Sequence, residues 1–246
     1  MITTHEVPLA FDEAAPSYDT MVARNPGYHA HLASAAEALL ESAPAAGPLR
    51  VVDLGCGSGA STRALVTAAG RAGRDVVVTG VDASSGMLEE AREKSWPDGV
   101  RFEHGLAQDL AERRAEFGLE SGVDGVLAAY LFRNVGPDER DAVLRDVHAL
   151  LGPDGVLVVQ EYSVAHSRAA DLVWSLVCWL VVSPLSWVTS RQTRLYRYLW
   201  RSVRAFDAVQ TFVDRLYAAG FVDVEVSTAP GWQRGILHTF RARRAG

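Results

Sequence analysis

The chain has 246 residues, of which 48% are hydrophobic and 22% are charged, so it is long and apolar enough to bury a large core. This composition excludes a disordered, collagen-like or mini-protein class, and a net charge of −6 disfavours a nucleic-acid-binding protein held by bulk positive charge. Cys56 and Cys178 are too few for a disulfide framework or a zinc site, so we expect no metal. The first residues lack a basic segment followed by an apolar run, so we expect no secretory signal and a cytoplasmic protein.

Residues 1–47 are predicted to form a helical cap, which ends in the Pro- and Gly-rich segment SAPAAGPL. Residues 48–165 then alternate strand-like apolar runs with helix-like segments, as in a parallel sheet of βαβ units. We predict strands at 50–54, 75–82, 100–105, 123–131 and 154–163, with helices after 59, from 84 or 85 to about 94, up to 117 and after 137. Because open parallel sheets bind ligands beyond the carboxyl ends of their strands, we expect the site at that edge.

Residues 166–205 are predicted to be an inserted apolar lid. Positions 172–190 carry no charge and include three tryptophans, a length close to the roughly 20 residues of a membrane-spanning helix. Pro184, the serines and the globular motifs on both sides favour a lid over a span, while a dimer interface or a membrane contact stays open. Residues 206–246 are expected to add a helix up to Gly220 and two strands, giving one domain for the whole chain.

Arginines follow the uncharged stretch at intervals of three or four. They are Arg191, Arg194, Arg197, Arg201 and Arg204. On a helix this spacing places them along one face, which is most often a solvated face. They adjoin tryptophans and tyrosines, however, and that mixture also suits an anionic membrane surface. Peripheral contact with a membrane is therefore kept as an alternative.

A glycine-rich loop follows the first predicted strand in the segment VVDLGCGSGAST. Gly55, Gly57 and Gly59 permit positive φ and a close approach of the backbone to a ligand. The segment also fits a loose dinucleotide-binding pattern, with Asp82 at the distance of a ribose-binding acid. Asp53, two residues before the first glycine, would repel a pyrophosphate but help to hold a cationic amino-acid ligand through ordered water. The loop therefore favours S-adenosylmethionine over NAD.

These motifs carry a resemblance that extends over nearly the whole chain. The D-x-G-x-G-x-G loop and the strand ending in Asp82 look like those of class I methyltransferases. The segments FDEAAPSYDTM, FRNV, QEYS, YRYLWRSVRAF and AAGFVDVEV resemble, in order, those of the ubiquinone/menaquinone C-methyltransferase (UbiE) family. The resemblance implies a Rossmann-like α/β fold with a mostly parallel seven-stranded sheet and helices on both faces. It also implies methyl transfer from S-adenosylmethionine to a ring carbon of an aromatic, quinol-like substrate.

The resemblance implies a set of cofactor-binding residues: Asp53, Gly55, Cys56, Gly57, Gly59, Asp82, Ala83, Met87, Ala107 and Asp109. The glycine loop with Asp53 would cradle the methionine part, and Asp82 would bind the ribose. The family's adenine segment has a polar residue before an alanine, whereas this chain has Leu106. Recognition of adenine is therefore expected to fall to Asp109 or to the backbone.

By the same resemblance, Tyr18, Arg133 and Asn134 would face the donor methyl group and the substrate. A free phenol has a pKa of about 10, so a nearby cation that stabilises the phenolate makes the ring carbon nucleophilic. Because a guanidinium stays protonated, Arg133 is expected to stabilise this charge rather than to act as the base. The proton acceptor would then be water or His29, the histidine that corresponds to a family histidine.

Two other functions are compatible with the sequence. A relative with the same scaffold could methylate a secondary metabolite, such as a polyketide or an indole-type ring. A protein of this fold could also bind the cofactor without methyl transfer and act as a membrane or partner module. The expected partner is a small aromatic molecule, prenylated or not, and no nucleic acid. A homodimer and a membrane-peripheral location stay open.

Overall fold

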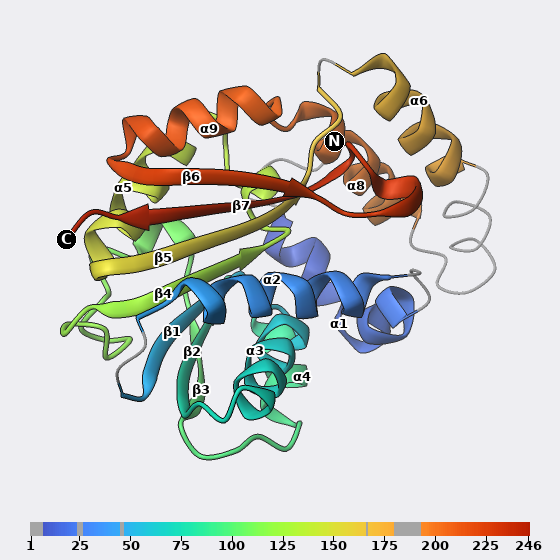
Figure 1. The fold of residues 1–246 in the computed structure, drawn as a ribbon. Coiled ribbons are helices and arrows are strands. Elements are labelled where there is room, and N and C mark those ends of the chain that lie inside the picture. The colour runs from blue at the N-terminus through green and yellow to red at the C-terminus, as the bar shows by residue number, and fades with distance from the viewer. Residues whose placement is uncertain (1–6, 24–26, 45–46, 166, 180–192) are drawn as a thin grey trace.

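The computed structural model describes residues 7–23, 27–44, 47–165, 167–179 and 193–246 (Figure 1). Seven strands form one sheet in the order β3-β2-β1-β4-β5-β7-β6. Strand β7 runs antiparallel to both of its neighbours, and the pairs from β3 to β5 are parallel. The strands are β1 (Leu49–Leu54), β2 (Val76–Asp82), β3 (Val100–His104), β4 (Val123–Ala129), β5 (Leu151–Tyr162), β6 (Phe221–Thr228) and β7 (Leu237–Arg244). The predicted mostly parallel, seven-stranded Rossmann-like sheet is confirmed.

Helices cover both faces of the sheet. The helices α2 (Tyr28–Ser42), α3 (Ala60–Arg71) and α4 (Ser85–Arg92) lie on one face, and α5 (Arg140–Leu150) and α9 (Val209–Ala218) lie on the other. Alternate residues of a strand point to opposite faces, so Val51 packs in the core beneath α2 and α3 while Val52 packs in the core beneath α5 and α9. Burial on both faces explains the nearly continuous apolar runs of the central strands.

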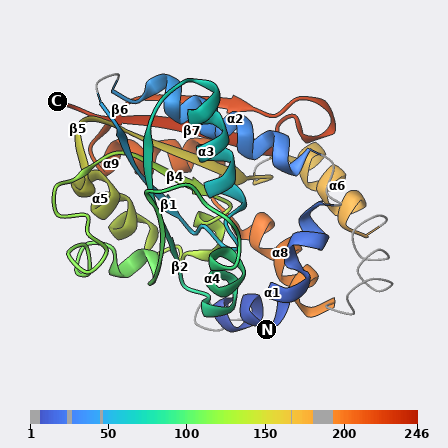
Figure 2. The same ribbon diagram turned by 90° about the horizontal axis from the view of Figure 1, so that it is seen from below.

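Three further helices gather at one end of the sheet, as both views show (Figures 1 and 2). These helices are α1 (Val7–Ala23), α6 (Arg168–Val177) and α8 (Thr193–Ala205). Helix α1 contacts α4, which follows β2, and α8 contacts the short helix η3 (Phe132–Asn134), which follows β4. Helix α1 of the predicted cap and the described helices of the inserted segment therefore lie at the carboxyl ends of the parallel strands, where the sequence predicts the site, whereas α2, also predicted as part of the cap, packs on a face of the sheet.

The helix predicted to run up to Phe117 was wrong. The structure has only a short 3₁₀ helix, η2 (Ala107–Asp109), followed by turns. The backbone N–H of Phe117 donates to the carbonyl four residues before it, that of Gly118 to the carbonyl three residues before it, and that of Leu119 to the carbonyl five residues before it. The regular four-residue pattern of an α-helix is therefore absent. Phe117 and Leu119 are both buried, and their packing on the core overrides the local helix propensity.

The predicted lid is described only in part. Helix α6 and residues up to Trp179 belong to the described chain, whereas residues 180–190 of the uncharged stretch lie outside it. Asp171 of α6 receives two hydrogen bonds from Arg204 of α8, which joins the two helices. Within the part of the chain that is described, no helix is both long enough and apolar enough to cross a bilayer.

Candidate functional site

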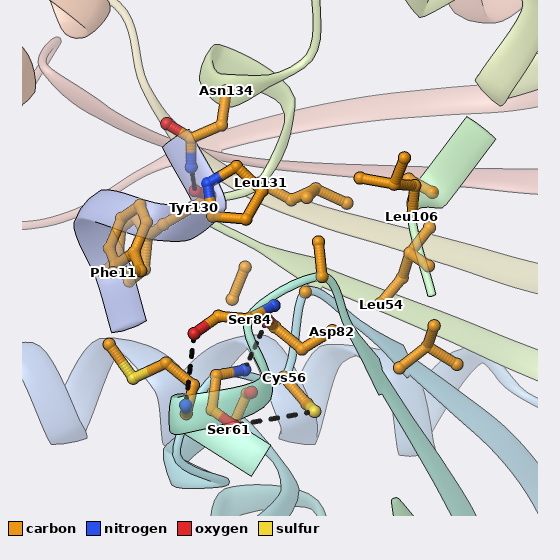
Figure 3. Close-up of a pocket in the computed structure, with 18 of the residues that line it drawn as sticks. Phe11, Leu54, Cys56, Ser61, Asp82, Ser84, Leu106, Tyr130, Leu131 and Asn134 are labelled. Carbon is orange, nitrogen blue, oxygen red and sulfur yellow. Dashed lines mark hydrogen bonds between the residues drawn. The ribbon is translucent and has the colours of Figure 1, made fainter. Parts of the chain in front are cut away.

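A cavity of about 420 Å³ lies at the carboxyl ends of β1, β2, β3 and β4. Its wall comes from the loop after β1, the ends of β2 and β4, the segment after β3, and side chains of α1 and α2. Figure 3 shows Cys56, Ser61 and Asp82 on one side of this space and Tyr130 and Asn134 on the other. The cavity therefore has two chemically distinct sides, one formed by the glycine loop and one by the segment after β4.

The glycine loop forms the first side. Gly55, Gly57 and Gly59 have φ values of 76°, 53° and 88°, which side-chain-bearing residues rarely adopt. A methyl group on Gly55 would meet Leu131 and one on Gly59 would meet Trp96, so these two glycines are needed for packing. Nothing lies within 4 Å of a methyl group placed on Gly57. Gly57 thus leaves open space for a ligand against its backbone.

Asp53 lies behind this loop rather than on the wall of the cavity. One of its oxygens, Oδ2, accepts hydrogen bonds from Ser61 Oγ at 2.7 Å and from Thr62 Oγ1 at 2.5 Å, which fixes the first turn of α3. The other oxygen, Oδ1, is buried and has no hydrogen-bond partner among the described residues. Burial raises the pKa of Asp53 to about 6, although the two hydroxyls act to lower it. An unpartnered buried carboxylate oxygen suits a cationic ligand reached through water.

Asp82, at the end of β2, connects this strand to the loop. Its Oδ2 accepts a hydrogen bond from the backbone N–H of Gly57, and its Oδ1 accepts one from that of Ser84, both at 2.8 Å. Burial raises the pKa of Asp82, against the opposing effect of these backbone donors. Of the other predicted cofactor-binding residues on this side, Cys56, Ala83 and Met87 all line the cavity. This side therefore presents an acid and an apolar floor, as a nucleoside with an amino-acid tail requires.

The segment after β3 contributes a third wall. Ala107 lines the cavity together with Leu106 and Gln108. Asp109 does not line it, because its carboxylate turns back to the N–H of Leu106 at 3.3 Å. The polar side chain of this segment that lines the cavity is instead Gln108, which donates a hydrogen bond to Glu139 Oε2 at 3.0 Å. Sequence comparison overlooked Gln108, since the family's polar position is the one occupied here by leucine.

Helix α1 forms part of the cavity wall and hydrogen bonds to two neighbouring segments. Asp12 accepts hydrogen bonds from Ser84 Oγ at 2.6 Å and from the N–H of Gly86 at 2.9 Å. Asp19 accepts one from Ser58 Oγ, in the glycine loop, at 2.5 Å. Both acids belong to the FDEAAPSYDTM segment, from which sequence reasoning selected only Tyr18. The motif therefore attaches the cap to the glycine loop and to α4.

On the opposite side, Arg133 is buried and forms an ion pair with a carboxylate of β5. Its Nη1 lies 2.7 Å from Glu161 Oε1, and its backbone N–H donates to Glu161 Oε2 at 3.2 Å. The exposed fractions of the two side chains are 7% and 0%. Burial is the largest single effect and acts to lower the pKa of Arg133, but the charge of Glu161, its hydrogen bond and the nearby tyrosines together outweigh burial and raise this pKa. The cation predicted at Arg133 is therefore paired with a carboxylate, and the sequence analysis did not identify this partner.

The side chain of Asn134 is held at both ends. Its Nδ2 donates to the carbonyl of Tyr130 at 3.2 Å, and its Oδ1 accepts a hydrogen bond from Tyr198 Oη of α8 at 2.8 Å. Burial raises the pKa of Tyr198 to about 12, so this hydroxyl remains a donor at neutral pH. The inserted segment thus reaches the site through Tyr198, which lies in the YRYLWRSVRAF motif.

Stacked tyrosines complete this side. The ring of Tyr130 lies between those of Tyr28 and Tyr162, with centroid distances of 5.5 Å and 5.2 Å and interplanar angles of 18° and 19°. The hydroxyls of Tyr18 and Tyr28 hydrogen bond to each other, and burial raises the pKa of both. Tyr130 has a φ of 60°, a strained value for a bulky residue that costs about 1–3 kcal/mol. The stack holds this conformation beside Arg133, which is typical of a functional site.

His29 is not brought into the cavity. Its side chain is exposed, packs edge-on against Tyr28 and lines a separate cleft between α2 and α3. Tyr18, Arg133 and Asn134, by contrast, all line the cavity itself. His104 is the histidine that lines the cavity within the described chain, and its Nε2 lies 3.0 Å from the carbonyl of Ala83.

The site fits the cofactor that the sequence predicts. Space against Gly57, an acid at the end of β2 and a buried unpartnered oxygen on Asp53 match a ribose and a cationic amino-acid tail. Within the described residues, no group of histidines, cysteines and acids is arranged to hold a metal ion.

Comparison with known proteins finds chains of the same fold. Among solved structures, the chain resembles the putative methyltransferase in a complex with the Haloferax volcanii Trm112 methyltransferase activator. The TM-score is 0.61 with 18% identity, covering 96% of this chain and 98% of that one. It also resembles the CurJ carbon methyltransferase (TM-score 0.58, 18% identity, 84% of this chain and 51% of that one). At these identities the likeness shows the shared fold alone.

Curated relatives are more similar in sequence. A demethylmenaquinone methyltransferase of Thermus thermophilus is 33% identical over 216 residues, which cover 86% of this chain and 90% of the relative. A ubiquinone/menaquinone biosynthesis C-methyltransferase UbiE of Bradyrhizobium diazoefficiens is 28% identical over 75% of this chain and 70% of the relative. The model of the ubiE/COQ5 methyltransferase family matches residues 2–239. The chain therefore belongs to the ubiE/COQ5 methyltransferase family.

Proposed function

We propose that this protein transfers a methyl group from S-adenosylmethionine to a ring carbon of an aromatic, quinol-type substrate. The names of the relatives support the substrate class, since they act on demethylmenaquinone or in ubiquinone and menaquinone biosynthesis. The observation that carries the proposal is the cavity itself. Its glycine loop lies opposite a wall of tyrosines that contains Arg133 and Asn134.

The residues on the loop side bind and orient the methyl donor. Gly57 offers its backbone and Asp82 its carboxylate, while Asp53 keeps one oxygen for the cationic amino-acid part. When bound, S-adenosylmethionine supplies an electrophilic methyl group on a sulfonium. Helix α1, attached through Asp12 and Asp19, covers this side and limits the entry of water.

The residues on the other side hold the aromatic ring and its hydroxyl. The stacked tyrosines offer flat apolar faces for a ring. Arg133 and the hydroxyl of Tyr18 offer hydrogen-bond donors to an oxygen whose negative charge grows as the ring carbon is methylated. Because these donors are buried and held in place, they need little reorganisation when that charge appears. Since His29 lies outside the cavity, water is the better candidate for the proton acceptor.

We further propose peripheral contact of α6 with a membrane surface. Leu172, Val173 and Leu176 of α6 and Trp179 just after it are exposed by 61%, 37%, 48% and 51%, so this segment presents apolar side chains to solvent. Arg201 of α8 is exposed as well, whereas Arg204 is paired with Asp171.

Cosedimentation with anionic vesicles tests this proposal. The wild-type protein should bind the vesicles, and the double variant Leu172→Asp/Leu176→Asp should not. If the wild-type protein does not bind vesicles even at low salt, a soluble secondary metabolite is favoured as the substrate. If the molecular mass of the protein in solution rises with its concentration, the apolar surface of α6 is favoured as a dimer interface.

A donor-transfer assay tests the main proposal. Purified protein would be incubated with a labelled methyl donor and a panel of quinols, simple phenols and indoles, and the products would be identified by mass. We expect the quinols to gain one labelled methyl group. Transfer to another ring class alone would support the secondary-metabolite alternative. Binding of S-adenosylhomocysteine without any transfer would support a non-catalytic binding module.

A further inference from the structure

Glu161 of β5 is fully buried, and both of its carboxylate oxygens accept hydrogen bonds from neighbouring groups. Oε1 receives Arg133 Nη1 at 2.7 Å and the N–H of Tyr162 at 2.9 Å. Oε2 receives the backbone N–H of Arg133 at 3.2 Å. The carboxylate therefore fixes the arginine at two points, its backbone and its guanidinium. Removing one partner of such a buried pair leaves an uncompensated charge, which is costly for the fold.

The surroundings of this pair add little further charge. Four tyrosines face it or its guanidinium from different elements, namely Tyr18 of α1, Tyr28 of α2, Tyr130 at the end of β4 and Tyr198 of α8. Burial raises the pKa of each, so all four stay neutral at physiological pH. Arg140 of α5 also acts on Glu161, but its own charge is met by Asp207 at 2.9 Å. Apart from Glu139, whose carboxylate accepts hydrogen bonds from Gln108 and from the N–H of Gly136, the cavity wall around this pair is thus close to neutral.

A buried arginine without a partner would make this cavity an anion site. It would favour phenolates and aromatic carboxylates over neutral phenols, because the attraction between opposite charges is strong where water is excluded. With the carboxylate beside it, Arg133 stays protonated and retains its donors, including an Nε–H that has no partner among the described residues, but the pair as a whole carries no net charge. A compensated guanidinium can hydrogen bond a neutral hydroxyl without requiring that it ionise first.

We propose that Glu161 determines the charge selectivity of the site, as a positioning residue that neutralises Arg133 so that the cavity takes an aromatic hydroxyl in its uncharged form. Such a site would admit neutral phenols and quinols and discriminate against anionic rings. The inference rests on the proposed function to the extent that an aromatic hydroxyl is the ligand. Glu161 contacts Arg133 and not the substrate ring, so it acts on the substrate through Arg133.

A spectroscopic titration of bound 4-nitrophenol tests this role without requiring turnover. The ionised form of this probe absorbs at longer wavelength than the neutral form, so the pKa of the bound probe can be read in the presence of S-adenosylhomocysteine. In the wild-type protein we expect a pKa equal to or above that of the free probe. In Glu161→Gln we expect the pKa to fall by about one pH unit or more, a tenfold change in the ionisation equilibrium. Benzoate should also bind at least about tenfold more tightly to this variant.

Two controls separate this effect from damage to the fold. Arg133→Gln/Glu161→Gln removes both charges and should return the pKa of the bound probe to the wild-type value. This double variant leaves no unpaired buried charge, so it also tests the inference if Glu161→Gln alone folds poorly. Asp171→Asn removes a carboxylate that pairs with Arg204 outside the cavity and should leave the bound pKa unchanged.

The inference is overturned if Glu161→Gln leaves the bound pKa at the wild-type value, or if the double variant is shifted as far as the single one. It is also overturned if the wild-type protein binds no nitrophenol, since the cavity would then not be a site for aromatic hydroxyls. Failure of the proposed function appears differently, as a lack of methyl transfer to any quinol in the mass assay. The two failures can therefore be told apart.

Discussion

The ammonium of Lys94, the only lysine of the chain, lies 2.5 Å from Asp19 Oδ2 and 2.6 Å from the carbonyl of Ser58. It thereby joins three segments: the cap helix α1, the glycine loop and the residues after α4. Of these residues, Ser58 lines the cavity beside Gly57, whereas Asp19 and Lys94 line the separate cleft between α2 and α3. Helix α1 is thus attached to the glycine loop at the residue that follows Gly57.

Breaking this contact should speed the release of the cofactor product. The two side chains are 32% and 47% exposed, so solvent screening limits the pair to about 0.2–1 kcal/mol. We therefore expect Lys94→Met to raise the dissociation rate of S-adenosylhomocysteine by a factor of about 1.4–5, measured by stopped-flow displacement. Arg71→Met is the matched control, because Arg71, which pairs with Glu37, lies in the last turn of α3, at the opposite end of this helix from the loop. An unchanged rate in Lys94→Met would show that α1 does not govern release.

Asp82 should contribute strongly to the affinity for S-adenosylhomocysteine. Asp82→Ala removes an acceptor that lines the cavity and also releases the backbone N–H of Gly57, so we expect a loss of about 1.5–3 kcal/mol in calorimetry. Asp109→Ala should leave the affinity nearly unchanged, because that carboxylate faces away from the cavity. Equal losses in the two variants, or tight binding of NAD by the wild type, would contradict this assignment.

The stability of the cofactor-free protein should report the buried carboxylate of Asp53. Burial raises the pKa of Asp53 from 3.8 to about 6, so the folded chain holds this proton more tightly than the unfolded chain. Protonated Asp53 therefore stabilises the folded chain, by about 3 kcal/mol, at a pH below the pKa that this group has in the unfolded chain. This stabilisation is lost as the pH rises to about 6. Relative to Asp53→Asn, the wild type should lose this free energy of unfolding between pH 4 and 6.5. The free energy of unfolding is measured by denaturant titration at each pH. If it changes with pH by the same amount in both proteins, the raised pKa of Asp53 is refuted.

Tyr198 should matter for turnover but not for cofactor binding. Its hydroxyl orients Asn134, and this hydrogen bond is worth about 0.5–1.5 kcal/mol. Tyr198→Phe should therefore lower kcat by a factor of about 2–12 while the affinity for S-adenosylhomocysteine stays the same. Tyr217→Phe, at an exposed position of α9, is the control. A parallel loss of affinity would instead point to a general disturbance of the fold.

The sequence was sufficient for the parts of the site that follow from local pattern. Continuous apolar runs predicted the strands, and the glycine spacing with Asp82 predicted the cofactor side, because both signals lie within one βαβ unit. Ser84 accepts a hydrogen bond from the N–H of Met87, so the helix start predicted at 84 or 85 is also a local capping signal.

The ion pairs of the site were not predicted, because they join segments that are far apart in the sequence. Arg133 and Glu161 are 28 positions apart, and Asp19 and Lys94 are 75 apart. No spacing rule links such pairs until the topology places the ends of β4 and β5, or α1 and α4, side by side. His29 shows the converse, since a family correspondence assigned it a role while the start of α2 turns its side chain toward solvent.

The most direct test of the central claim is where the transferred methyl group is bonded. The donor would carry a ¹³C-labelled methyl group, the acceptor would be a demethylated quinol, and carbon NMR of the product distinguishes a ring-bound methyl from a methoxy group. We predict a ring-bound methyl with the wild-type protein and a large loss of product with Arg133→Ala at unchanged affinity for S-adenosylhomocysteine. A methoxy product, or undiminished ring methylation by Arg133→Ala, would contradict carbon methylation at the Arg133 side of this cavity.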